Sequence, residues 1–215
     1  MPDPEDHWVD WHRAYDIDGS PLQRRLAIVQ RQIRNALDGC APGRIRVVSM
    51  CAGQGRDLIG ALAGHPRVAD VQACLVELDP RNCEAARASA PAGVQIVVGD
   101  ASLTSMYEGA TPAEIVLACG VFGNISDAYI VRTIEMIPLL CAPGATVIWT
   151  RHRREPDLTP DIRQWFVAAG FAEIAFEAPD DFIFAVGTNR LAAPPAAFRP
   201  DAQMFEFVGS DQIWK

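Results

Sequence analysis

The segment from Val47 to Ile59 constrains the fold of this chain more than any other. A mostly apolar run ends at Met50, and the sequence Cys-Ala-Gly-Gln-Gly-Arg-Asp follows before a helical pattern begins. A strand that leads through a glycine loop into a helix is typical of α/β folds that bind nucleoside-containing cofactors. Gly53 and Gly55 allow the backbone to approach a ligand closely and to adopt positive φ angles. We therefore expect a nucleoside site at this loop.

Strand and helix patterns alternate along the rest of the chain. Ser20 and Pro21 form a helix start that is followed by apolar residues at helical spacing, and Gly39 ends that helix. Further helices are expected over about 56–64, from Pro80 onward, over about 127–140 and over about 160–169. Strands are expected over 45–50, 71–78, 94–98, 115–118, 145–150, 172–177 and 182–186, with Pro143-Gly144 as the turn into the fifth.

This alternation predicts an α/β fold, a Rossmann-like, doubly wound sheet of seven mostly parallel strands. Only a tight turn separates the last two strands, so they are expected to form a C-terminal antiparallel hairpin, because a parallel crossover needs a dozen or more residues. We expect one domain, with a helical cap or lid over 1–40 and a cofactor-binding core over 41–190. The tail over 191–215 is expected either to add an edge strand or to wrap the domain.

Composition excludes several classes of function. The net charge of −8 argues against a nucleic-acid partner, because such proteins usually carry a basic surface. No apolar run approaches the roughly 18 residues of a membrane span, and the acidic N-terminus does not resemble a secretory signal. The six cysteines lack the spacing of a zinc site and are expected to be reduced and buried, as in a cytoplasmic protein. No metal is expected.

Residues after the loop discriminate between cofactors. A nicotinamide fingerprint has a small third residue, but Leu58 stands at that position, which disfavours a dehydrogenase. Glu77 ends the second strand, where a carboxylate can accept both ribose hydroxyls of an adenosine. Asp100 follows the third strand, where a carboxylate suits the exocyclic amine of adenine.

With these residues the chain resembles the class I S-adenosylmethionine-dependent methyltransferases from about Arg44 to about Val186. The glycine loop, Glu77 and Asp100 match that family's motifs in order and spacing, as do the segments 116–127 and 139–145. The loop variant also resembles that of a bacterial subgroup. The resemblance implies S-adenosylmethionine (SAM) as cofactor, S-adenosylhomocysteine (SAH) as product, and the following cofactor-binding residues: Tyr15, Met50, Cys51, Gly53, Gly55, Arg56, Glu77, Leu78, Asp100, Ala101 and Cys119.

The loop departs from the family pattern at two positions. The family often begins this loop with an acid and a glycine, whereas this chain has Ser49 and Cys51. Backbone carbonyls near Met50 and Cys119 are alternatives for holding the methionine ammonium group. Arg56 or Arg25 could hold the methionine carboxylate, although a surface role is equally open for both. Asp57 could be only a helix-start acid, and Phe122 is expected to fill the core rather than to contact adenine.

Methyl transfer from a sulfonium is an in-line displacement, and a hydroxyl nucleophile needs a nearby base. The histidines are His7, His12, His65 and His152. His152 follows the fifth strand at the sheet edge that faces the expected cleft, and His12 lies in an aromatic N-terminal segment that could cover the cofactor. We expect these two as catalytic candidates, with a solvated surface role as the alternative. His65 is expected to cap the helix that it follows.

The function expected from these residues is SAM-dependent methyl transfer to oxygen or nitrogen of a small molecule, by a monomer or homodimer. One alternative is a SAM-fold binding or regulatory protein without transferase chemistry, because no base is evident. Another is an NAD(P)-dependent reductase, and a nucleic-acid methyltransferase is a distant fourth.

Overall fold

The structure is a computed structural model that describes residues 14–208. Its centre is a seven-stranded sheet of order β3-β2-β1-β4-β5-β7-β6, in which only the pairings of β7 are antiparallel. The strands are β1 Ile45–Ser49, β2 Val71–Glu77, β3 Val94–Val98, β4 Ala113–Ala118, β5 Cys141–His152, β6 Phe171–Glu177 and β7 Phe184–Leu191. The expected Rossmann-like sheet with its C-terminal antiparallel pair is confirmed.

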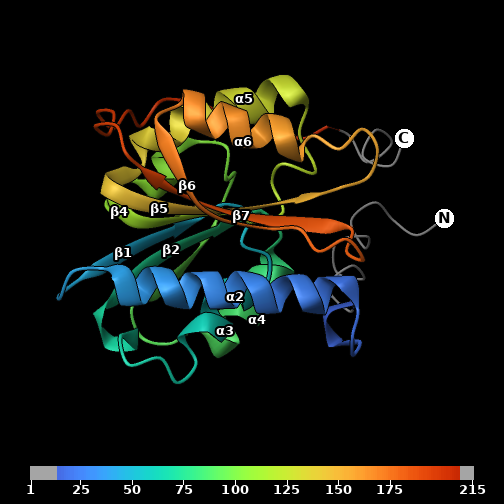
Figure 1. Cartoon of the computed structure of the whole chain (residues 1–215). Coiled ribbons are helices and arrows are strands. Elements are labelled where there is room, and N and C mark those ends of the chain that lie inside the picture. The colour runs from blue at the N-terminus through green and yellow to red at the C-terminus, as the bar shows by residue number, and fades with distance from the viewer. Residues whose placement is uncertain (1–13, 209–215) are drawn as a thin grey trace.

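Helices cover both faces of the sheet (Figure 1). Helices α2 Pro21–Gly39, α3 Arg56–Leu62 and α4 Pro80–Ser89 lie on one face, and α5 Asp127–Met136 and α6 Thr159–Ala168 lie on the other. Ser20, Asp79 and Ser126 are N-caps, because each side chain accepts a hydrogen bond from a backbone N–H in the first turn. Single 3₁₀ turns are η1 Ala14–Asp16, η2 Val68–Asp70, η3 Thr104–Tyr107 and η4 Ile137–Leu139.

Each face of the sheet buries its own apolar core. On the first face, apolar residues of α2, α3 and α4 pack on alternate side chains of β1, β2 and β4. On the second, α5 and α6 pack on the intervening side chains, around an aromatic group of Phe122, Trp149 and Phe166. Burial of two apolar layers fixes the strand register, because a slip by one residue would exchange the two sets of side chains.

Three expected elements have clearly different bounds in the structure: the helix from Asp127, the fifth strand and the last strand. The helix expected over 127–140 ends at Met136 and continues as η4, because Pro138 has no N–H and restricts the residue before it. Pro143-Gly144 is not a turn before the fifth strand but a bulge inside β5. Ala113 pairs with Cys141 and Ile115 with Thr146, so three extra residues of β5 are accommodated there.

Strand β7 is longer than the expected 182–186, because its polar residues lie inside the sheet. It lies between β5 and β6, and Asn189 is buried, its Oδ1 accepting a hydrogen bond of 2.8 Å from Trp149 Nε1. A polar side chain that finds a partner inside the sheet does not end a strand.

The described part of the tail wraps the domain and does not extend the sheet edge. It forms isolated bridges between Leu103 and Gln203 and between Ile125 and Phe207. Met204 and Phe205 are fully buried against the α5 face. The tail therefore connects the loop after β3 with the loop after β4.

Candidate functional site

The carboxyl ends of β1, β2, β3 and β4 meet along one edge of the sheet. Strand order reverses between β1 and β4, since β2 and β3 lie on one side and β5 on the other. Ligands of open α/β sheets bind outside the strand ends at such a point. The fold thereby brings together the glycine loop, Glu77, Asp100 and Cys119, which lie on different strand ends.

The glycine loop has the backbone that its sequence predicts. Gly53 and Gly55 have φ angles of 55° and 69°, and a Cβ on Gly55 would lie 2.7 Å from Ile59 Cδ1. Cys51 also has a positive φ, of 50°, and no other described residue except glycine does. The chain therefore keeps at Cys51 the conformation for which the family pattern uses glycine, although a side chain makes it less favourable.

Glu77 fastens this loop to the end of β2. Its Oε2 accepts a hydrogen bond of 2.8 Å from Gly53 N, and its Oε1 accepts one of 2.9 Å from Asp79 N. A carboxylate oxygen can accept two hydrogen bonds, so each oxygen retains one acceptor position. Two adjacent acceptors beside a glycine loop fit the two hydroxyls of a ribose, and the residues present thus suit an adenosine-containing cofactor.

Asp100, Leu78 and Ala101 lie at the neighbouring strand ends. Asp100 is exposed, and its Oδ1 accepts a hydrogen bond of 2.9 Å from Ser102 N. Leu78 is 66% exposed, whereas Ala101 is buried. The second oxygen of Asp100 accepts no hydrogen bond from a described residue, and recognition of adenine by Asp100 stays a prediction.

A mostly buried polar cluster consists of Tyr15, Arg25, Asp57 and Cys119. Asp57 is partly exposed, and the other three residues are buried. Arg25 is 4% exposed, donates a hydrogen bond to the Tyr15 hydroxyl and lies 5.8 Å from the Phe184 ring centre. The side chains of Asp57 and Cys119 are hydrogen-bonded to each other. Each of the four residues is singled out in the sequence, but their contact could not be predicted, because they come from four separate segments.

Burial dominates the electrostatics of this cluster. It raises the pKa of the Asp57 carboxyl, although the Arg25 guanidinium acts in the opposite direction. It also raises the pKa of the Tyr15 hydroxyl and of the Cys119 thiol, which Asp57 raises further. Burial acts to lower the pKa of Arg25. The pKa is nevertheless above its ordinary value, because it is raised by the charges of Tyr15, Asp57 and Cys119. Asp57 is therefore more than an exposed helix-start acid.

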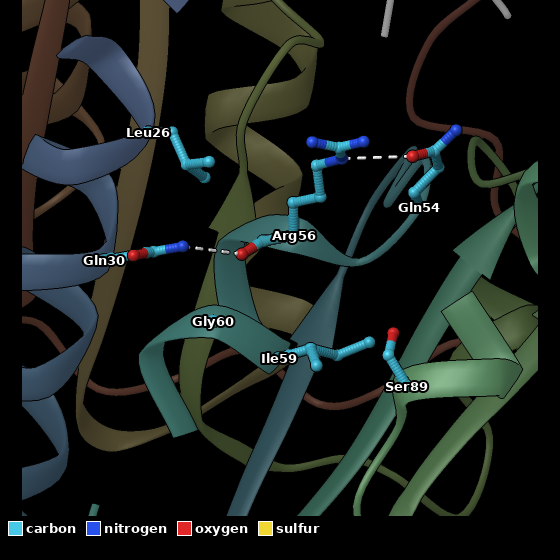
Figure 2. A pocket seen from close by; sticks show the side chains of 7 residues that line it. All are labelled: Leu26, Gln30, Gln54, Arg56, Ile59, Gly60 and Ser89. Carbon is cyan, nitrogen blue, oxygen red and sulfur yellow. Dashed lines mark hydrogen bonds between the residues drawn. The ribbon is translucent and has the colours of Figure 1, made fainter. Parts of the chain in front are cut away.

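Arg56 joins the N-terminal turn η1 to the glycine loop. Its guanidinium donates to Asp16 at 2.6 Å and 3.3 Å, and its Nε donates to Gln54 Oε1 at 3.0 Å. Arg56 and Gln54 line a pocket of about 250 Å³ between α2, α3 and the end of α4. Figure 2 shows them with the other lining side chains. Gln30 donates to the Arg56 carbonyl at 2.9 Å across this pocket, which lies beside α3 and not at the strand ends.

His152 and Arg151 end β5 beside the loop that follows β4. A Cβ on Gly123 would lie 3.6 Å from His152 Cδ2 and 3.9 Å from Arg151 Nη1, and Arg151 donates to the Phe122 carbonyl. Burial lowers the pKa of His152 to about 4, and the charges of Arg151 and Arg154 act in the same direction against Asp157. His152 is thus neutral near pH 7 and a weaker base than an ordinary histidine. Phe122 is fully buried, as expected of a core residue.

The other candidate bases lie elsewhere. His65 Nε2 lies 3.3 Å from Asp38 Oδ1, and His65 Nδ1 accepts from Arg67 N, so it links α2 to the loop after α3 and does not cap α3. The prediction for His12, and the open role of His7, fall outside the described residues.

Met50, a predicted cofactor-binding residue, is fully buried, and its N–H donates to Leu117 O at 2.9 Å.

Within residues 14–208, every helix is too short or too polar to span a membrane. No three His, Cys, Asp or Glu side chains in this range are grouped so that they could hold a metal ion. All six cysteines are free; Cys40 and Cys51 are partly exposed and the other four are buried.

No family model and no curated protein matches this chain. Solved structures do match it. The CurJ carbon methyltransferase superposes with a TM-score of 0.66 at 14% identity over 89% of this chain, which spans 61% of that structure. The 1,6-didemethyltoxoflavin-N1-methyltransferase of Burkholderia thailandensis, solved with S-adenosylhomocysteine, gives 0.59 at 16% identity, over 90% of this chain and 92% of that one.

The magnesium protoporphyrin IX methyltransferase of Synechocystis PCC 6803, solved with bound SAM, gives a TM-score of 0.59 at 14% identity, covering 86% of this chain and 90% of that one. These neighbours transfer methyl groups to different acceptors, and fold similarity at such identities does not specify function. The chain has the fold of the SAM-dependent methyltransferases.

Proposed function

We propose that this protein transfers a methyl group from SAM to oxygen or nitrogen of a small molecule. The observation that carries the proposal is the Glu77 carboxylate, which is fixed to Gly53 at the strand switch point with one free acceptor position on each oxygen. When bound, SAM supplies a methyl group that is activated for in-line displacement. The task of the protein is then to orient the acceptor and to exclude water.

In this proposal, residues at two strand ends would each bind a different part of the nucleoside. Glu77 would accept the ribose hydroxyls, and Asp100 would accept from the adenine amine. Leu78, which is 66% exposed, and Ala101 would provide apolar surface for the adenine ring. Gly53 and Gly55 would allow the backbone to approach the cofactor, since neither carries a Cβ.

The buried polar cluster suggests how the chain compensates for the missing loop acid. Ser49 stands where the family often has a carboxylate, but the Asp57 carboxylate lies beside Cys119 at the end of β4. Asp57 would therefore hold the methionine ammonium group. Arg25 and Tyr15, which contact each other beside Asp57, would hold the methionine carboxylate, whereas Arg56 is engaged by Asp16.

His152 is the proposed general base for a hydroxyl acceptor. It lies at the end of β5, beside the loop after β4, where its ring could accept the hydroxyl proton. The second candidate function, a SAM-binding protein without transferase chemistry, is favoured by the absence of any other histidine from the described part of this sheet edge.

Transfer of label separates the two candidates. The protein would be incubated with SAM that carries a deuterated methyl group and with a fractionated extract of small metabolites. Mass spectrometry should detect a deuterated methyl group on at least one metabolite, and His152→Ala should reduce the rate for a hydroxyl acceptor by about 10²-fold. Binding of SAM without labelled product in any fraction would favour the binding protein.

A further inference from the structure

Arg151 is a partly buried cation without a matching anion. Its side chain donates one hydrogen bond, to the Phe122 carbonyl, while its Nε is buried and has no hydrogen-bond partner within the described residues. No carboxylate among residues 14–208 lies within ion-pair distance of it, whereas other arginines there, such as Arg56 and Arg163, pair with carboxylates. A buried charge that lacks a partner is costly.

His152, the next residue, presents the same pattern. Its Nδ1 is buried and has no hydrogen-bond partner in the described chain. Both side chains approach Gly123, through Cδ2 of His152 and Nη1 of Arg151, so the two residues lie beside the same loop after β4. Native proteins satisfy the large majority of buried polar groups, and exceptions need an explanation such as a ligand.

Neighbouring charges do not satisfy Arg151. Asp127 and Asp157 both favour its charged form, but burial outweighs them and lowers its pKa. Asp157 is already engaged, because it accepts from Thr159 N at 2.9 Å and lies 3.4 Å from Arg153 Nε. Arg153 in turn donates to the carbonyls of Ala178 and Pro179. Arg153 and Asp157 are therefore engaged with other groups, whereas Arg151 has no carboxylate partner among residues 14–208.

We propose that the acceptor molecule carries an oxyanion, a carboxylate or a phosphate, and that Arg151 binds it beside His152. This inference rests on the proposed function, because it assigns the end of β5 to the acceptor. A planar guanidinium suits both anions, through charge-assisted hydrogen bonds. Arg151 would then determine specificity, by orienting the acceptor so that its nucleophile lies near His152.

Titration with matched probes tests this site. Benzoate, phenyl phosphate and neutral benzamide would be added to the SAH-loaded protein while NMR follows the His152 ring. An anion bound at Arg151 should raise the His152 pKa by about one unit, since a nearby opposite charge favours the protonated form. Benzoate against phenyl phosphate distinguishes a carboxylate from a phosphate site, and benzamide should give no such shift.

Variants decide whether Arg151 is responsible. Arg151→Met should weaken anion binding at least tenfold and Arg151→Lys less, because lysine retains the charge. Arg190→Met is the matched control, since Arg190 is exposed and pairs with Thr146 near the opposite end of β5. Equal binding by the Arg151→Met variant, equal binding of benzamide, or no binding of either anion at millimolar concentration would overturn the proposal. SAH affinity, measured separately, reports on the proposed function instead.

Discussion

At the scale of residues, Glu77 carries the proposed cofactor site. Its carboxylate bonds the backbone of Gly53 and Asp79, so it fixes the loop and offers its remaining acceptor positions to a ligand. We expect Glu77→Gln to weaken SAH binding by about 10- to 100-fold, because hydrogen bonds to a charged group contribute about 1.5–3 kcal/mol. Isothermal titration calorimetry measures the change.

The matched control for this variant is Glu84→Gln. Glu84 lies on the exposed side of α4, and its loss should leave SAH affinity unchanged. If both variants bind SAH as tightly as the unmodified protein, Glu77 does not contact the ribose.

His152 makes stability depend on pH. Its pKa is about 4 in the folded protein and 6.5 as an ordinary value, so the unfolded chain binds the proton more tightly. The stability that neutral His152 contributes is therefore complete above pH 6.5 and is lost as pH falls toward 4. Urea unfolding at pH 7 and at pH 5 measures this loss of unfolding free energy. The loss should be smaller in His152→Gln than in the unmodified protein, and the two losses should differ by less than about 1.4 kcal/mol per pH unit.

This comparison isolates one group, because the other histidines are common to both proteins. An identical pH dependence in the two proteins would show that His152 titrates normally and is not buried beside Arg151.

Residues at strand ends could be predicted from sequence, and the buried cluster could not. Glu77 and Asp100 follow apolar runs directly, so the parallel topology alone places them at one edge. Arg25 and Asp57 meet because α2 packs beside α3, and no local pattern encodes that contact. The sequence marks Cys51 as an exception, but only the structure gives its positive φ.

At the scale of elements, periodicity locates strands and helices well and their ends less well. The helix α5 ends before Pro138. Strand β5 begins before Pro143, because its pairing with β4 accommodates a bulge at Pro143-Gly144, a sequence that is typical of a turn. Strand β7 extends through polar residues, since Asn189 finds Trp149 as a partner inside the sheet. Tertiary partners, which one sequence does not show, set these boundaries.

The tail is an element whose role the structure reveals. Phe205 is fully buried against the α5 face, whereas Phe207 is 45% exposed. We expect Phe205→Ala to reduce the free energy of unfolding by about 3–5 kcal/mol, because it leaves a cavity in the core. Chemical denaturation measures the loss, with Phe207→Ala as the milder control. Equal effects of the two substitutions would mean that the tail is not part of the core.

At the scale of the whole molecule, the sheet could be predicted from sequence and the methyl acceptor could not. The alternation of elements predicted the seven-stranded sheet, and the short final turn predicted its antiparallel pair. The acceptor could not be predicted, because the segments around the β4 and β5 ends carry no general motif. The unpaired nitrogens of Arg151 and His152 become visible only once the chain is folded.

Calorimetric titration of the protein with SAH, NADH and NADPH tests the proposed cofactor specificity most directly. We expect saturable binding of SAH with one site per chain and no binding of either nicotinamide nucleotide. Failure of both SAH and SAM to bind at millimolar concentration, or saturable binding of NADH or NADPH instead, would contradict it.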